Sequence, residues 1–141
     1  MTSISHSPQE GRWRARIRDM PPPPAQCGDV FWVFRDVTRR PWTFGPKKSR
    51  PCCCVDADPP EEEVWTAIPR LTTGISKSDL RSAASPSIGL DRDGAWSLRF
   101  IHQVLKSKTG GDACRYLGTL DENERDCLVG LYEQRFREQR A

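Results

Sequence analysis

The sequence predicts a mainly β protein, in which short and mostly antiparallel strands form a small barrel or a strongly twisted sheet and one helix ends the chain. Three observations support this fold class. Short apolar runs are rich in aromatic and β-branched residues, and Gly, Pro and Asp turn signals separate them. Only the C-terminal segment has apolar residues at helical spacing.

Composition limits the size of the core and the expected location of the protein. With 36% hydrophobic and 29% charged residues, the 141-residue chain has material for one domain with a modest core. The net charge of +3 is too small to indicate nucleic-acid binding by itself. No apolar run approaches the roughly 20 residues that span a bilayer, and the N-terminal segment lacks the apolar region of a secretory signal. We expect a cytoplasmic protein with no membrane partner.

Two parts of the chain differ in character. Residues 1–26 combine a polar, Ser-rich start, an alternation of Arg with apolar residues, and a polyproline run at residues 21–24. We expect a disordered, basic and proline-rich arm there, with an arm that contacts nucleic acid as the alternative. Residues 27–141 are expected to form the barrel domain with its C-terminal helix.

The first two strands are expected at residues 28–34 and 50–55. A Gly-Asp turn signal opens the first, and Pro51 stands at the start of the second, where proline is tolerated. The loop between them holds cations and two aromatic side chains. This suits single-stranded nucleic acid, because cations neutralise phosphates and aromatic faces stack on bases. The alternative is a solvated loop with a partly buried Trp. The cations are Arg35, Arg39, Arg40, Lys47, Lys48 and Arg50, and the aromatic residues are Trp42 and Phe44.

Further strands are expected before the helix. Residues 64–68 read as the third strand, and residues 75–88 as a long loop with at most one short strand. Asp93-Gly94 is a hairpin turn signal. Alternating apolar residues then predict a single half-buried strand within residues 95–105. Residues 114–117 are expected to form the last short strand.

The C-terminal helix is expected at residues 122–137. Asp121 is suited to cap its first turn, and Glu124 lies three residues later, as in a capping box. Acidic residues at its start and basic residues near its end suit the helix dipole. Its apolar residues form two adjoining stripes. They are Cys127, Leu128 and Leu131 in one stripe, and Val129, Tyr132 and Phe136 in the other.

The six cysteines do not have the spacing of a metal site. No C-x-x-C pair occurs, and the chain has only two histidines. In a strand, Cys52 and Cys54 point to one face and Cys53 to the other, so the three cannot converge on one ion. We therefore expect free thiols that act as small hydrophobic residues, with no metal and no cofactor.

Five motifs, in order over residues 27–136, resemble the PemK/MazF family of toxins. They are Gly28-Asp29-Val30-Phe31-Trp32-Val33; Arg50-Pro51 ahead of an apolar strand; residues 64–73, which end in Thr; residues 90–94 running into Phe100-Ile101-His102-Gln103-Val104; and Gly118-Thr119-Leu120-Asp121-Glu122 entering a helix.

This resemblance implies an SH3-like barrel, usually a homodimer, that cleaves single-stranded RNA without a metal. The RNA's own 2′-hydroxyl is the nucleophile, and the products are a cyclic phosphate and a 5′-hydroxyl. A small acidic antitoxin that covers the cationic groove is implied as a partner. The resemblance points to Arg50 as a catalytic residue, because a guanidinium fits two phosphate oxygens. It points to either Thr72 or Thr73 as the second catalytic residue. Because the chain has one extra residue near Leu71, either threonine can match the family position.

The predicted RNA-binding residues follow from the same resemblance. Arg39, Arg40, Lys47 and Lys48 are expected to contact phosphates, Trp42 to stack on a base, and Gln103 to read a base edge.

The family does not usually have a histidine at the position of His102, so we expect a surface or interface residue there. The chain also lacks the family's usual Gly-Ser-Glu run before Arg50-Pro51, and its second strand is rich in Cys. A catalytically inactive or diverged barrel that binds protein or nucleic acid is therefore the alternative function.

Overall fold

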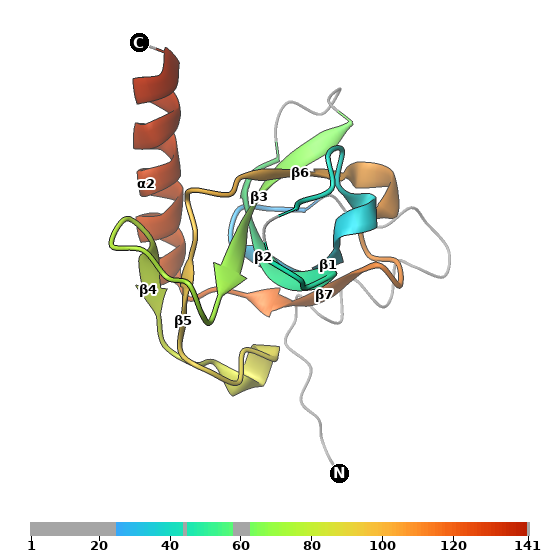
Figure 1. The fold of residues 1–141 in the computed structure, drawn as a ribbon, viewed down its shortest axis with the longest axis horizontal. Helices are drawn as coiled ribbons and strands as arrows, with labels where there is room; N and C mark the ends of the chain where they lie inside the picture. The colour runs from blue at the N-terminus through green and yellow to red at the C-terminus, as the bar shows by residue number, and fades with distance from the viewer. Residues whose placement is uncertain (1–24, 44, 58–62, 141) are drawn as a thin grey trace.

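The computed structural model describes residues 25–43, 45–57 and 63–140, with the side chains of residues 137–140 left aside. Most of the predicted N-terminal arm lies outside the described residues. Seven antiparallel strands form one sheet, and a C-terminal helix follows them (Figure 1). The predicted mainly β fold with one closing helix is therefore confirmed.

The strands follow one another with short 3-10 turns between several of them. Their bounds are β1 (Asp29–Phe34), β2 (Ser49–Asp56), β3 (Val64–Leu71), β4 (Leu80–Ser82), β5 (Gly94–Trp96), β6 (His102–Leu105) and β7 (Cys114–Thr119). The turns are η1 (Arg35–Val37), η2 (Pro86–Ile88) and η3 (Lys106–Lys108). The sheet order is β4-β5-β3-β2-β1-β7, and β6 also pairs with β3. Among the described residues, the strands pair in a linear order, with β6 as an additional partner of β3. No pairing between the first and last strands of this order closes the sheet there, so closure into an SH3-like barrel stays a prediction.

The central strands bury side chains on both faces of the sheet. One core cluster includes Phe31, Cys52 and Cys54, and the other lies beneath the helix and includes Val30 and Cys53. The predicted alternation of the three consecutive cysteines is thus confirmed, and each of them is fully buried. Because both faces are covered, these strands read as nearly continuous apolar runs rather than as a clean alternation.

The single strand predicted within residues 95–105 is wrong, because this segment forms two strands. β5 pairs with the end of β3, and β6 pairs with its beginning. Pro69 lies between the two contacts, where its carbonyl accepts a hydrogen bond from the Ser97 N–H at 2.8 Å. Proline has no N–H, so Pro69 cannot donate a second hydrogen bond to this segment. The hydrogen-bond ladder along β3 is therefore interrupted between β5 and β6.

The Asp93-Gly94 signal predicted a hairpin turn, but these residues end a longer connection between β4 and β5. β4 and β5 do pair, but the chain between them includes η2, and Gly94 is the first residue of β5. A Cβ atom at Gly94 would lie 2.5 Å from the Leu71 carbonyl oxygen. Only glycine therefore fits where β5 approaches β3.

Helix α2 (Glu122–Arg140) begins at the predicted residue and is longer than expected. The Asp121 carboxylate accepts the Glu124 N–H at 2.9 Å, so the predicted cap is confirmed. Leu128 and Tyr132 are buried against the sheet, whereas Cys127, Leu131 and Phe136 of the predicted stripes are exposed. The helix packs through its first half, and its later turns extend past the strands (Figure 1). None of the described helices is long and apolar enough to cross a membrane.

The Glu124 side chain holds the first turn of α2 on the sheet. Its Oε2 atom accepts hydrogen bonds from the Ser82 hydroxyl of β4 and from the Trp96 indole N–H of β5, both at 2.6 Å. Trp96 is fully buried, so water cannot replace Glu124 as the acceptor for its indole N–H. One carboxylate therefore joins the helix to two strands.

We predict that Glu124→Ala lowers the free energy of unfolding by about 1–3 kcal/mol, because it leaves the buried Trp96 N–H unsatisfied. Chemical denaturation of the variant measures this loss. Glu122→Ala is the matched control, since Glu122 lies in the same turn with 80% of its side chain exposed, and should change stability by less than about 0.5 kcal/mol. Equal effects of the two substitutions would assign the loss to the helix dipole instead.

Candidate functional site

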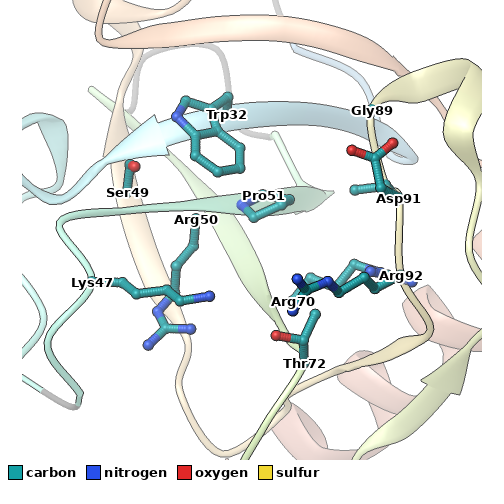
Figure 2. A pocket seen from close by; sticks show the side chains of 11 residues that line it. Trp32, Lys47, Ser49, Arg50, Pro51, Arg70, Thr72, Gly89, Asp91 and Arg92 are labelled. Atoms are coloured by element: carbon teal, nitrogen blue, oxygen red, sulfur yellow. The ribbon is translucent and has the colours of Figure 1, made fainter.

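A pocket of about 320 Å³ opens where β1 ends, β2 begins and β3 ends (Figure 2). The β1–β2 loop and the loop before β5 complete its wall. Trp32 lies on one side of this pocket and Thr72 on the other, with Lys47 and Arg50 toward one end and Asp91 and Arg92 toward the other (Figure 2). The lining residues are Trp32, Lys47, Ser49, Arg50, Pro51, Arg70, Thr72, Gly89, Leu90, Asp91 and Arg92.

The charge of the pocket lining is strongly positive. Four of its residues, Lys47, Arg50, Arg70 and Arg92, are cations, and Asp91 is the one acid among them. Two of the cations are buried, because Arg50 is 8% exposed and Arg70 is 4% exposed. Guanidinium groups withdrawn from water interact more strongly with an anion than solvated ones do. The pocket is therefore suited to a phosphate group.

Arg50 lies beneath the β1–β2 loop. Burial lowers the pKa of its guanidinium below the ordinary value, and Cys52 acts in the opposite direction. Gly45 has a φ of +71°, and a Cβ atom there would lie 2.9 Å from the Arg50 Nη2 atom. The loop can cover Arg50 this closely because Gly45 has no side chain.

Arg70 is held from behind by the backbone around β4. Its Nη2 atom donates to the carbonyl oxygens of Ser82 at 3.0 Å and of Ala83 at 3.1 Å. Its guanidinium carbon lies 5.8 Å from the centre of the Trp96 ring. Burial lowers the pKa of Arg70, and the charge of Glu124 opposes this shift. These contacts fix the direction in which Arg70 enters the pocket.

The two threonines differ in position. Thr72 lines the pocket and is half-buried, whereas Thr73 is exposed and is not part of the lining. Thr72 points its hydroxyl toward the side of the pocket that holds Arg50 (Figure 2). The geometry therefore favours Thr72 over Thr73.

The loop after Thr72 is tied down by a buried carboxylate. Asp79 accepts hydrogen bonds from the Ser76 N–H, the Ser97 hydroxyl and the Arg99 guanidinium at 2.8–3.2 Å. Arg99 also donates to the Gly74 carbonyl at 2.9 Å. Burial alone would raise the pKa of Asp79, but these hydrogen bonds lower it overall. The turn that follows Thr72 is therefore fixed to the β5–β6 segment.

Trp32 is a pocket residue that the sequence reasoning missed. It is half-buried, pairs with Pro51 of β2, and presents its ring to the pocket (Figure 2). Its neighbours Phe31 and Val33 point to the other face and are fully buried. Period-two alternation within β1 was the signal that could have identified it. Arg70, Asp91 and Arg92 were missed as well.

The other predicted RNA-binding residues lie elsewhere. Arg39, Arg40, Lys48 and Gln103 are exposed but are not part of the pocket lining. The Arg39 N–H donates to the Gln103 carbonyl at 2.8 Å, so these two residues are neighbours outside the pocket lining. Of the predicted phosphate contacts, only Lys47 joins Arg50 and Thr72 in the pocket.

Trp42 is 3% exposed, and its indole N–H donates to the Lys47 carbonyl at 2.8 Å. Its ring lies 5.0 Å from the His102 ring, between centres. A base cannot stack on a buried ring, so the predicted role of Trp42 does not fit this conformation. The alternative, a solvated loop with a partly buried Trp, is closer to the structure, although Trp42 is more deeply buried than that alternative expected. Trp42 serves to hold the loop that covers Arg50.

His102 is 9% exposed, so the expected surface position is wrong. Burial and, to a smaller degree, the charge of Arg50 lower its pKa to about 4. The imidazole is therefore neutral at physiological pH, and His102 is not among the pocket residues.

The pocket offers cationic groups, hydroxyls and one carboxylate, which is a donor set for an anion rather than for a metal ion. Within the described ranges, no three His, Cys, Asp or Glu side chains gather as metal ligands would. No protein-family model matches this chain, and no curated protein matches it either.

We predict that the free energy of unfolding falls by about 2 kcal/mol between pH 7 and pH 5 because of His102. In this window the unfolded chain binds a proton at His102, with an ordinary pKa of 6.5, and the folded chain does not until about pH 4. Urea unfolding at the two pH values measures the change. Asp79, with its lowered carboxyl pKa, acts in a more acidic window.

The variant His102→Gln is the control for this slope. Whatever its absolute stability, it should lose most of the difference between pH 7 and pH 5. An unchanged difference in the variant would show that another group titrates there.

Proposed function

We propose that this protein is a metal-independent endoribonuclease that cleaves single-stranded RNA at the pocket around Arg50, as a toxin of the PemK/MazF type. One observation carries the proposal: two buried guanidinium groups, Arg50 and Arg70, line one pocket with the Thr72 hydroxyl. The resemblance in sequence independently pointed to Arg50 and to a threonine at this position. The mainly β fold with a C-terminal helix is compatible with the SH3-like barrel that the resemblance implies.

The charge and shape of the pocket support the proposal that it binds RNA. Lys47 and Arg92 are exposed cations at its rim, where they would attract the phosphate backbone. Trp32 supplies the aromatic face on which a base next to the scissile phosphate would stack. Single-stranded RNA fits this arrangement better than a duplex, because only unpaired bases expose their faces.

The chemistry requires a proton acceptor and a stabiliser of negative charge. The 2′-hydroxyl oxygen attacks the adjacent phosphorus and the bond from phosphorus to the 5′-oxygen breaks. The 5′-oxygen takes up a proton from water, so the products are a cyclic phosphate and a 5′-hydroxyl. Arg50 and Arg70 would stabilise the charge on the phosphoryl oxygens, and Thr72 would donate to one of them. Asp91, the carboxylate among the lining residues, is our candidate to accept the 2′-hydroxyl proton.

A cognate antitoxin and a homodimer belong to the same proposal. A small acidic and partly disordered chain would complement the cationic pocket and block RNA. The cytoplasm, where the RNA substrate is found, is the proposed location.

A second candidate function is RNA or protein binding without cleavage. The 8% exposure of Arg50 favours it, because little of this side chain is accessible to a scissile phosphate. This function predicts tight binding with no products, so one assay distinguishes the two.

We predict that the protein cuts a long single-stranded RNA in EDTA and that Arg50→Ala reduces the rate by about 100-fold or more, since it removes a group that stabilises the transition state. Thr72→Val should reduce it by about tenfold or more. Gel analysis of the products over time gives both rates, and 2′,3′-cyclic phosphate ends identify the chemistry.

Thr73→Val is the matched control, because Thr73 is adjacent but exposed and outside the lining. It should cleave at the parent rate. If the folded parent binds this RNA but leaves it intact, the binding function replaces the enzyme. If Thr73→Val is the slower threonine variant, the site is misassigned.

We predict that Trp32→Leu weakens binding of a short single-stranded RNA by about 1–3 kcal/mol, because it removes a stacking platform. Fluorescence anisotropy with Arg50→Ala as the background prevents cleavage during the measurement. Phe34→Ala is the control: Phe34 is also on β1 and 39% exposed, but lies outside the pocket lining. Equal weakening in both variants would argue against a base on Trp32.

A further inference from the structure

The guanidinium of Arg70 is fixed by contacts from two short segments behind the pocket. Its Nη2 atom donates to the carbonyl oxygens of Ser82 and Ala83, at 3.0 and 3.1 Å. A Cβ atom at Gly94 would lie 3.0 Å from its Nη1 atom, so the guanidinium lies directly against the β5 backbone. The ring of Trp96, also on β5, has its centre 5.8 Å from the guanidinium carbon. The segments around β4 and β5 therefore set the orientation of this cation.

Both segments are held by one carboxylate on α2. The Glu124 Oε2 atom accepts hydrogen bonds from the Ser82 hydroxyl and from the Trp96 indole N–H, each at 2.6 Å. These are two of the residues that contact Arg70, Ser82 through its carbonyl and Trp96 through its ring. β4 and β5 contain three residues each, and a pair of strands this short is only marginally stable by itself. The hydrogen bonds to Glu124 therefore support the segments that orient Arg70.

We propose that Glu124 is a positioning residue for the pocket: by fixing Ser82 and Trp96, it holds Arg70 in the orientation that binds a phosphate group. Glu124 is not among the lining residues, so it acts through Arg70 rather than on the ligand. A guanidinium that is already oriented loses less side-chain freedom when it binds an anion, and its affinity is higher for that reason. The inference rests on the phosphate-binding part of the proposed function and does not require RNA cleavage.

Orientation and charge have opposite effects on phosphate binding. A carboxylate behind the pocket repels a phosphate, so its removal strengthens binding if charge is the main effect of Glu124. Its removal weakens binding if the main effect is to hold Ser82 and Trp96. Glu124→Ala loses both the charge and the two hydrogen bonds. Glu124→Gln loses only the charge, because the amide oxygen can still accept both bonds.

The test titrates inorganic phosphate into the full-length protein at neutral pH and constant ionic strength, with arginine labelled for nitrogen NMR. The Arg70 Nε atom is buried, which slows exchange of its proton with water and keeps its signal visible. This signal, assigned by its loss in Arg70→Lys, gives the dissociation constant for phosphate. We expect Glu124→Ala to weaken phosphate binding about tenfold, which is the equivalent of one hydrogen bond to a charged group. We expect Glu124→Gln to bind at least as tightly as the parent.

Two further variants complete the design. Glu122→Gln removes a carboxylate from the same turn of α2, at a side chain that is 80% exposed, and should leave phosphate affinity unchanged. Ser82→Ala removes one hydrogen bond to Glu124 but keeps the carbonyl that accepts from Arg70, and should weaken binding about threefold. It provides the test if Glu124→Ala does not fold, and backbone amide spectra show which variants are folded.

The outcomes separate positioning from its alternatives. The proposal is overturned if both substitutions of Glu124 strengthen phosphate binding, because charge alone then acts, or if neither changes it, because Glu124 is then purely structural. Equal weakening by both also overturns it, because the hydrogen bonds would not be the cause. So does a parent whose Arg70 signal does not respond to phosphate. A protein that shows the expected pattern but leaves RNA intact would refute the ribonuclease and not the role of Glu124.

Discussion

The burial of both faces of β1, β2 and β3 is the constraint on which the rest of the structure depends. Consecutive side chains of a strand point to opposite faces, and here most side chains on both faces of the central strands are buried. Polar groups that must meet a ligand can therefore sit only where these strands begin or end. β1 and β3 run in the same direction and β2 is antiparallel to both. The C-terminal ends of β1 and β3 and the N-terminal end of β2 therefore meet at one edge of the sheet. The cationic pocket lies at that edge.

The back of the pocket is continuous with the surface on which α2 rests. Glu124 of the helix binds Ser82 and Trp96, while Arg70 binds the Ser82 carbonyl and lies over the Trp96 ring. A buried guanidinium is costly unless hydrogen bonds and a nearby negative charge compensate it. The helix supplies that charge through Glu124, which opposes the shift that burial causes in the Arg70 pKa. The closing helix thus contributes to the electrostatics of the pocket without lining it.

Local patterns in the sequence predicted much of the fold and less of the site. The Gly-Asp opening of β1, the alternation of the three cysteines and the Asp121 cap each depend on neighbouring residues, and each was predicted correctly. The split between β5 and β6 was not, because Pro69 of another strand causes it. The pocket combines four segments that are distant in sequence, so Arg70 and its neighbours carried no local signal. Whether an aromatic residue in a polar loop stacks outward or packs inward depends on the core that it meets, as Trp42 shows.

The Asp79 network has a consequence for the ionic strength at which this protein is handled. Its carboxylate is fully buried and bound on several sides, and ion pairs of this kind are screened little by dissolved salt. The cations Lys47 and Arg92 are instead exposed, and attraction between such groups and a polyanion decreases steeply as salt is added. A concentrated salt wash therefore separates the two kinds of electrostatic interaction in this molecule. Added salt weakens interactions of the exposed cations at the pocket rim, while the turn that follows Thr72 keeps its shape.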